Sequence, residues 1–230
     1  MNTEGEFFCP TLVNHWRSLL AQGLSSEDWS ASRGQISNIA YNLQYLEFLD
    51  YHIHYSVLHS TVGAITHKML VVTGMSIVES ILFAVLDKSN MLGVHEWQTI
   101  NEDIGRVQTI DQVTVRTRTI VEMKLETPIP KSLTLDQMVK KVEKKHLIDL
   151  DQQSFADLSR LRKLRNKIHI HDVPTAQDTD WNTFGLKESN LIKSVLHALL
   201  TSSLFNPTSS QLEYCQFLDY RPEKWVLKSN

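Results

Sequence analysis

Five basic residues and two histidines gather in one short segment of the sequence, from Leu158 to Pro174. The basic residues are Arg160, Arg162, Lys163, Arg165 and Lys167, and no acid lies among them. A guanidinium such as that of Arg165 can hold a phosphate with two hydrogen bonds, and the amide of Asn166 can orient an oxygen. A histidine, His169 or His171, with an ordinary pKa of about 6.5, can move a proton at neutral pH. Because RNA supplies its own nucleophile, the 2′-hydroxyl, these groups could cleave RNA without a metal ion.

A leucine stripe through the same segment predicts that it is helical. The stripe recurs every three or four residues over a helix of about 153–169 and consists of Leu158, Leu161, Leu164 and Ile168. At 100° per residue, Arg165 and His169 lie one turn apart at the edge of this stripe, and Arg162 joins them one turn earlier. A purely structural interpretation stays open, because basic residues in a last turn stabilise the helix dipole by about 0.3–1 kcal/mol each. Amphipathic helices also carry charged outer faces.

The composition is that of an ordinary globular chain without a bulk attraction for nucleic acid. The 230 residues are 42% hydrophobic and carry a net charge of −3, so contact with RNA requires a local basic patch. The two cysteines, Cys9 and Cys215, lack metal-ligand spacing, and His52, His54 and His59 have no accompanying ligand pattern. We therefore expect no metal and no cofactor. The acidic start of the chain does not resemble an export signal, and we expect a cytoplasmic protein.

The remaining pattern predicts a mainly α protein, an antiparallel helical bundle with a small β insertion. Helices are expected around 13–22, from Ser32 to about 58, after a capping box at Thr134 and Gln137, and over about 187–204. Alternating apolar and polar residues predict two or three short strands within about 97–130. The apolar segment Met69–Leu86 contains Glu79, and a buried central helix fits it better than a membrane span. We expect one domain, with a helical core over about 32–205 and a tail over 206–230.

The motif and the order of helices resemble the HEPN superfamily (higher eukaryotes and prokaryotes nucleotide-binding domains). Its antiparallel helical domains carry an arginine, four to six residues and then a histidine, often with asparagine directly after the arginine. Arg165-Asn166 matches the first part, and His171 follows after five intervening residues. His169 fits only when counted from Arg162, with six between, and the commonest spacing of four would fall on Ile170. A long first helix, a buried second helix carrying an acid, and a late motif helix followed by one more helix also match.

The resemblance implies a metal-independent endoribonuclease that cuts single-stranded RNA in a toxin–antitoxin, phage-defence or RNA-processing setting. Such proteins typically act as dimers in which two copies of the motif face each other. On this interpretation Arg165 holds the scissile phosphate, Asn166 orients Arg165 or the 2′-oxygen, and His171 or His169 is the acid or base. The product would be a 2′,3′-cyclic phosphate and a 5′-hydroxyl.

The other residues of the site have supporting roles in this hypothesis. Arg160, Lys163 and Lys167 would contact RNA, and Arg162 and a buried, paired Glu79 would support Arg165. The expected partners are RNA, a second copy of the chain and an antitoxin or regulatory protein, with no membrane. The alternative is a non-catalytic HEPN module for dimerisation or for binding a nucleotide or partner. The two hypotheses differ in whether the arginine and histidine side chains converge in an open cleft.

Overall fold

The computed structural model describes residues 8–25, 29–166 and 179–219, and of residues 29–31, 165 and 166 it describes the backbone alone. The chain forms two compact units. The helical unit comprises Met1–Ser89 and Thr134–Asn230, and the hairpin unit comprises Asn90–Leu133. The protein is therefore mainly α with a two-stranded antiparallel sheet, as the sequence predicted.

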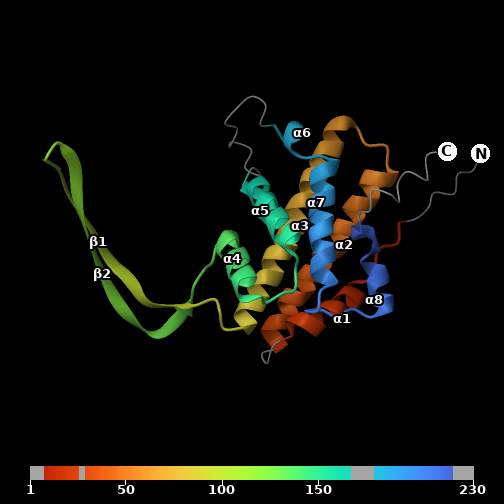
Figure 1. The fold of residues 1–230 in the computed structure, drawn as a ribbon, viewed down its shortest axis with the longest axis horizontal. Coiled ribbons are helices and arrows are strands. Elements are labelled where there is room, and N and C mark those ends of the chain that lie inside the picture. Colours follow the sequence, from red (N-terminus) through yellow and green to blue (C-terminus); the bar gives the residue numbers. More distant parts are fainter. Residues whose placement is uncertain (1–7, 26–28, 167–178, 220–230) are drawn as a thin grey trace, which may run out of the picture. The chain divides into compact units, whose positions relative to one another are not determined.

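The helical unit is built around one long apolar helix, α3 (Figure 1). Its elements are α1 (Val13–Leu24), α2 (Trp29–Tyr55), α3 (Ser60–Lys88), α4 (Leu135–Lys145), α5 (Gln152–Asn166), α6 (Asp180–Thr183), α7 (Leu186–Leu200), α8 (Ser209–Tyr214) and a 3₁₀ turn (Gln216–Leu218). Helix α3 contacts α1, α2, α4, α5, α6 and α7. Surrounded in this way, α3 is the centre of the core.

The packing of α7 against α3 depends on a glycine. A Cβ atom added to Gly74 would lie 2.4 Å from Cγ1 of Ile192 on α7, far inside van der Waals contact. The absence of a side chain at position 74 therefore lets the two helices approach closely. Within the described residues, α3 is long and apolar enough to cross a membrane, but 61% of its most apolar window is buried inside the structure. A core helix has the same composition, so this observation is weak evidence for a membrane span.

Several helix boundaries differ from the expected ones. Helix α2 already includes Trp29, and Ser32 lies within it as a buried residue instead of capping it. Helix α2 ends at Tyr55, three residues before the expected end, and α3 begins at Ser60, well before the apolar segment Met69–Leu86. Helix α7 ends at Leu200, four residues before the expected end. Packing decides these ends, because no strong local signal marks them.

Helix α4 follows its sequence signals closely. Thr134 accepts a hydrogen bond from the backbone N–H of Gln137, and the Gln137 side chain accepts from the backbone N–H of Thr134, which confirms the capping box. All four residues of the expected apolar face are buried, namely Leu135, Met138, Val139 and Val142. His146 then adopts a left-handed backbone conformation with φ of 50° and ends the helix.

The β insertion is a single hairpin of two strands, so the expected number of strands is confirmed at two, whereas the expectation that they are short is wrong. Strands β1 (Val94–Ile110) and β2 (Val113–Pro130) have 17 and 18 residues. The two turn residues, Asp111 and Gln112, have φ of 47° and 66°, as a type I′ turn requires. This turn matches the natural twist of the strands, which lets them stay paired from Ile110↔Val113 to Val94↔Pro130. Both strands are edge strands, so Pro128 is tolerated within β2.

Candidate active site at the end of helix α5

Helix α5 is held in the helical unit by its leucine face. Leu158 and Leu161 are fully buried and Leu164 is half-buried, as the stripe predicted. The helix contacts α3, α4 and α7. At its start, Asp151 accepts a hydrogen bond of 2.7 Å from the backbone N–H of Ser154, and the hydrogen bonds from Ser154 lower the pKa of this carboxyl. The anchored start and the buried stripe together fix the direction in which the basic end of α5 emerges.

Only part of the predicted motif lies within the described structure. Arg165 and Asn166 are the last two residues of α5, with the backbone described and the side chains not. Lys167, His169 and His171 lie outside the described residues, as does Ile168 of the leucine stripe. The distance between the arginine and either histidine is therefore not part of the described geometry, and the choice between His169 and His171 stays a prediction.

The basic residues earlier in α5 face different neighbours. Arg162 forms an ion pair with Asp136 in the first turn of α4. Asp136 also accepts a hydrogen bond of 2.8 Å from Lys140, and this bond, followed by the charge of Arg162, lowers the pKa of the Asp136 carboxyl. Arg162 therefore links α5 to α4. A phosphate bound near Arg165 would therefore compete with Asp136 for the Arg162 guanidinium.

Arg160 and Lys163 lie closer to solvent. One Nη of Arg160 lies 3.9 Å from Oε1 of Glu188 at the start of α7, and the Arg160 side chain is 49% exposed. Lys163 is exposed. These two residues are accessible to a polyanion, as an RNA contact requires.

Glu79 is half-buried on α3, so the predicted burial of this residue is met only in part. Its position explains this result. Glu79 belongs to a row of α3 residues at spacings of three and four that are exposed or half-buried, namely Val62, Ile65, Met69, Val72, Ser76, Glu79 and Phe83. The apolar run in the sequence concealed this row, because most of its members are themselves apolar.

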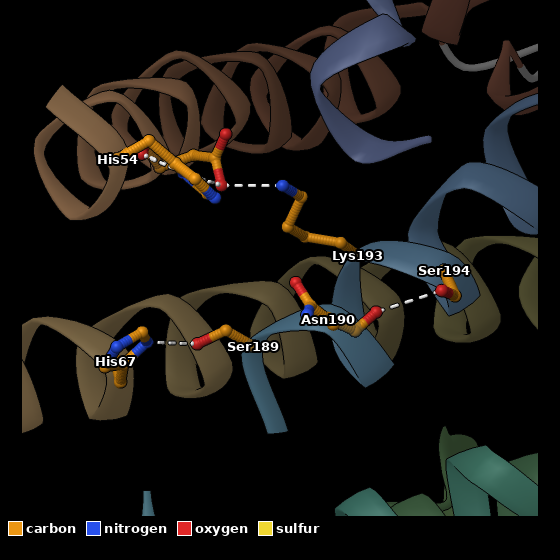
Figure 2. A network of polar contacts seen from close by, with 7 residues as sticks. His54, His67, Ser189, Asn190, Lys193 and Ser194 are labelled. Carbon is orange, nitrogen blue, oxygen red and sulfur yellow. Dashed lines mark hydrogen bonds and ion pairs between the residues drawn. The ribbon is translucent and has the colours of Figure 1, made fainter. Parts of the chain in front are cut away.

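The start of α7 connects α5 to a polar cluster on α3. Next to Glu188, the hydroxyl of Ser189 lies 2.8 Å from Nδ1 of His67 (Figure 2). One residue further along α3, Nζ of Lys68 donates to both carboxylate oxygens of Asp180 on α6, at 2.9 and 3.0 Å. This cluster ties α3, α6 and α7 together.

The protonation of His67 is set by its surroundings. Burial, followed by the nearby His54, lowers the pKa of the His67 imidazole, although Glu188 and Asp50 act in the opposite direction. A lowered pKa keeps the ring neutral at pH 7, as a general base requires. Ser189, however, is only 2% exposed, so no substrate can reach its hydroxyl. His67 and Ser189 therefore do not form a nucleophile and base pair for hydrolysis.

A buried ion pair joins α2 to α7 on another side of the cluster. Nζ of Lys193 donates to Oδ1 of Asp50 at 2.7 Å, and the Lys193 side chain is 3% exposed (Figure 2). The imidazole of His54 donates from Nδ1 to the backbone oxygen of Asp50 at 2.8 Å, which fixes its tautomer. A buried charge without a partner is costly. Because a shift of α7 along α2 would separate Lys193 from Asp50, the pair fixes the register of the two helices.

The sequence contains a signal for this pair outside the motif at the end of α5. Asp50 continues the apolar row of Leu43 and Leu46 on α2, and Lys193 directly follows the buried Ile192 and lies one turn after the buried Ser189 on α7. A charge of each sign on the buried face of two helices suggests a buried pair. Pairing them requires knowing that α2 and α7 are neighbours, which the sequence does not state.

Among the described residues, no group of three or more histidine, cysteine, aspartate or glutamate side chains is arranged to hold a metal ion. No protein-family model, no curated protein and no solved structure matches the chain. The candidate site therefore depends on the residues of α5 and their surroundings.

Proposed function

We propose that the protein is a metal-independent endoribonuclease that cuts single-stranded RNA at the basic end of α5. The observation that carries the proposal is the sequence Arg165-Asn166, followed by His169 and His171, at the end of a helix anchored against α3, α4 and α7. The proposed fold is a HEPN-like bundle, with α2 as the long first helix, α3 as the central helix and α7 as the helix after the motif.

Helix periodicity supports a role for Arg165 apart from general surface charge. Position 165 follows Leu158 by seven residues, about two turns, so its backbone lies on the same side of α5 as the buried leucines. An arginine at this position can hold a phosphate with two hydrogen bonds.

In the proposed reaction one histidine removes the proton from the 2′-hydroxyl, and the 2′-oxygen attacks the adjacent phosphorus. A bond forms between the 2′-oxygen and phosphorus while the bond from phosphorus to the 5′-oxygen breaks. A second histidine, from the same chain or from the partner copy of a dimer, protonates the leaving 5′-oxygen. Arg165 neutralises the extra negative charge on the phosphate, and Asn166 orients Arg165 or the 2′-oxygen. The products are a 2′,3′-cyclic phosphate and a 5′-hydroxyl.

The test is cleavage of a fluorescent single-stranded RNA in excess EDTA, with the ends of the products identified by mass spectrometry. Arg165→Ala should lower the rate at least a hundredfold, and Arg165→Lys should restore little of it, because lysine lacks the two-pronged grip. Lys145→Ala is the control, because it removes an exposed cation from α4, outside the proposed site. It should change the rate less than about threefold at physiological salt.

Single alanine variants at 169 and 171 decide which histidine acts, and His171 is favoured by its spacing from Arg165. If His169→Ala alone abolishes cleavage, the mechanism stands and this assignment is wrong. If no RNA is cut in EDTA, or if Arg165→Ala matches the unmodified protein, the ribonuclease proposal fails. The non-catalytic binding module is then preferred, and sedimentation with nucleotides or RNA becomes the relevant measurement.

A further inference from the structure

A cavity of about 320 Å³ lies in the helical unit between α2, α7 and the 3₁₀ turn. Its walls come from the second half of α2, from Lys193 on α7, from residues of the 3₁₀ turn and from Phe8 before α1. None of the described residues of α5 lines it. Its volume is at the lower end of the range for small-molecule sites, about 300–1,000 Å³. One heterocycle fills a space of this size, whereas a folded peptide does not.

Four aromatic rings line this cavity, from Phe8, Tyr51, Tyr55 and Phe217. The ring centroids of Phe8 and Tyr51 are 4.8 Å apart, and those of Tyr51 and Tyr55 are 5.0 Å apart in a stacked arrangement. Such rings offer flat apolar surface on which a planar ligand stacks. The aromatic wall therefore favours a flat, conjugated ligand.

The polar group of the cavity with unused hydrogen-bonding capacity is Lys193. Its ammonium has three N–H donors, and one of them is used by Asp50 at 2.7 Å. Among the described residues, no second acceptor lies within hydrogen-bonding distance of this Nζ. The side chain is 3% exposed, so bulk water does not freely satisfy the other two donors. A ligand in the cavity should therefore present an acceptor atom to Lys193.

The Glu47 carboxylate supplies acceptors elsewhere in the cavity wall. Glu47 accepts from the backbone N–H of Thr11 at 2.9 Å and from its hydroxyl at 3.3 Å, which leaves lone pairs on both oxygens. A ligand with N–H groups on one edge can donate to the Glu47 oxygens. The same ligand must then combine acceptors and donors around a flat ring.

The charge of the lining excludes a phosphate from the interior. Among the described residues that line the cavity, Glu47, Asp50 and Asp219 are acidic, and Lys193 is the one lysine or arginine. A neutral ring can enter such a site, whereas an attached phosphate must stay at the mouth. A simple organic cation would suit the negative charge, but it would leave the two free donors of Lys193 without an acceptor.

The geometry points to a nucleobase site in this cavity, with guanine as the preferred base. Guanine presents its O6 and N7 as acceptors, the atoms that lysine and arginine bind most often. Its N1–H and 2-amino group are donors on the adjacent edge, which suit the Glu47 carboxylate. The base would stack on the ring of Tyr55 or Tyr51. The inference is independent of the proposed cleavage, because binding is measured without any reaction.

The test is isothermal titration of the whole protein with guanosine 5′-monophosphate, inosine 5′-monophosphate, cytidine 5′-monophosphate and choline. We expect guanosine monophosphate to bind at least tenfold more tightly than the cytidine compound. Inosine monophosphate lacks only the 2-amino group and should bind with intermediate affinity. Equal affinity for the guanine and cytosine compounds, displacement of the guanine compound by choline, or no binding at millimolar concentration would each overturn the inference.

Variants connect the binding to this cavity. Tyr55→Leu removes a 64% exposed ring from the cavity wall and should weaken guanosine monophosphate binding at least fivefold. Tyr45→Leu is the matched control, since Tyr45 is 41% exposed on the same helix and is not among the residues that line the cavity. Glu47→Gln should weaken the guanine compound more than the inosine compound. If Tyr45→Leu weakens binding as much as Tyr55→Leu does, the site lies elsewhere and the inference is wrong.

The source of the base is distinguished by comparing guanosine monophosphate with an oligouridine that contains one guanosine. A tenfold tighter binding of the oligonucleotide assigns the cavity to a base of RNA, and equal affinities assign it to a free nucleotide. Both results support a nucleobase site. Because Tyr55→Leu tests mononucleotide binding and Arg165→Ala tests RNA cleavage in separate assays, a failure of the ribonuclease proposal and a failure of this inference can be told apart.

Discussion

Removal of the Lys193 ammonium should destabilise the protein more than the loss of any surface ion pair. In Lys193→Met the stem of the side chain is kept and the charge is lost, so the Asp50 carboxylate remains without its partner. At 2.7 Å and an effective dielectric constant of about 20, two unit charges attract by roughly 6 kcal/mol before the cost of desolvation is subtracted. Breaking a buried pair on one side typically costs about 3–5 kcal/mol.

The structure favours the lower end of that range. The Asp50 side chain is 13% exposed and lines the cavity, so water can reach the carboxylate once Lys193 has been replaced. We therefore expect Lys193→Met to lower the free energy of unfolding by about 3 kcal/mol at pH 7. In a chain of 230 residues this corresponds to a fall of the melting temperature by roughly 6–12 °C.

The assay is urea unfolding followed by circular dichroism for Lys193→Met, Asp50→Asn and the double variant. The double variant removes both charges and should lie within about 1.5 kcal/mol of the unmodified protein, which gives a coupling energy of at least about 2 kcal/mol. Lys140→Met is the control, because Lys140 pairs with Asp136 at 2.8 Å with its side chain 72% exposed. It should cost less than about 0.5 kcal/mol. Strictly additive effects at Asp50 and Lys193, or a cost below about 1 kcal/mol for Lys193→Met, would refute the reasoning.

Three further predictions concern packing, thiol reactivity and pH. Gly74→Ala should cost about 1–3 kcal/mol in urea unfolding because its methyl group would overlap α7, whereas Gly34→Ala, with no atom within 4 Å, should stabilise by about 0.5–1 kcal/mol. Burial raises the pKa of the Cys215 thiol to about 12, so the folded protein should react with one equivalent of a thiol reagent at pH 8, at the exposed Cys9, and with two after unfolding. Burial raises the pKa of the Glu47 carboxyl above its ordinary value of 4.5, so its ionisation weakens the folded state as the pH rises through the pKa in the folded protein. Glu47→Gln should therefore raise the melting temperature at pH 7 and change it much less at pH 3, well below the ordinary value.

Features that depend on neighbouring residues in the sequence were predicted from it. The capping box of α4 joins Thr134 to Gln137, three residues apart, and the apolar face of the same helix repeats within one or two turns. Because such signals act through the backbone of a single helix, they hold in any tertiary context. The leucine stripe of α5 and the mainly α class follow for the same reason.

The hairpin shows how a local signal can be present and still mislead. Alternation correctly predicted strands, but their lengths depended on a turn at Asp111 and Gln112, where two non-glycine residues take positive φ. Neither residue belongs to the glycine-containing pairs that usually mark such a turn. The sequence therefore indicated β strands in this segment, but it did not show that a single turn joins two long strands.

The chemistry at the end of α5 was selected from the sequence by residue type and spacing, because an arginine, an asparagine and histidines can be recognised without coordinates. The polar contacts between helices were decided by tertiary structure alone. Asp50 and Lys193 are 143 residues apart, and His67 and Ser189 are 122 apart. Such pairs form only after α2, α3 and α7 have packed side by side, and the free energy of a charge depends on that burial more than on its neighbours in the chain. The sequence thus determined which helices form and where basic charge collects, whereas packing decided which charges are buried, which are paired and where a cavity remains.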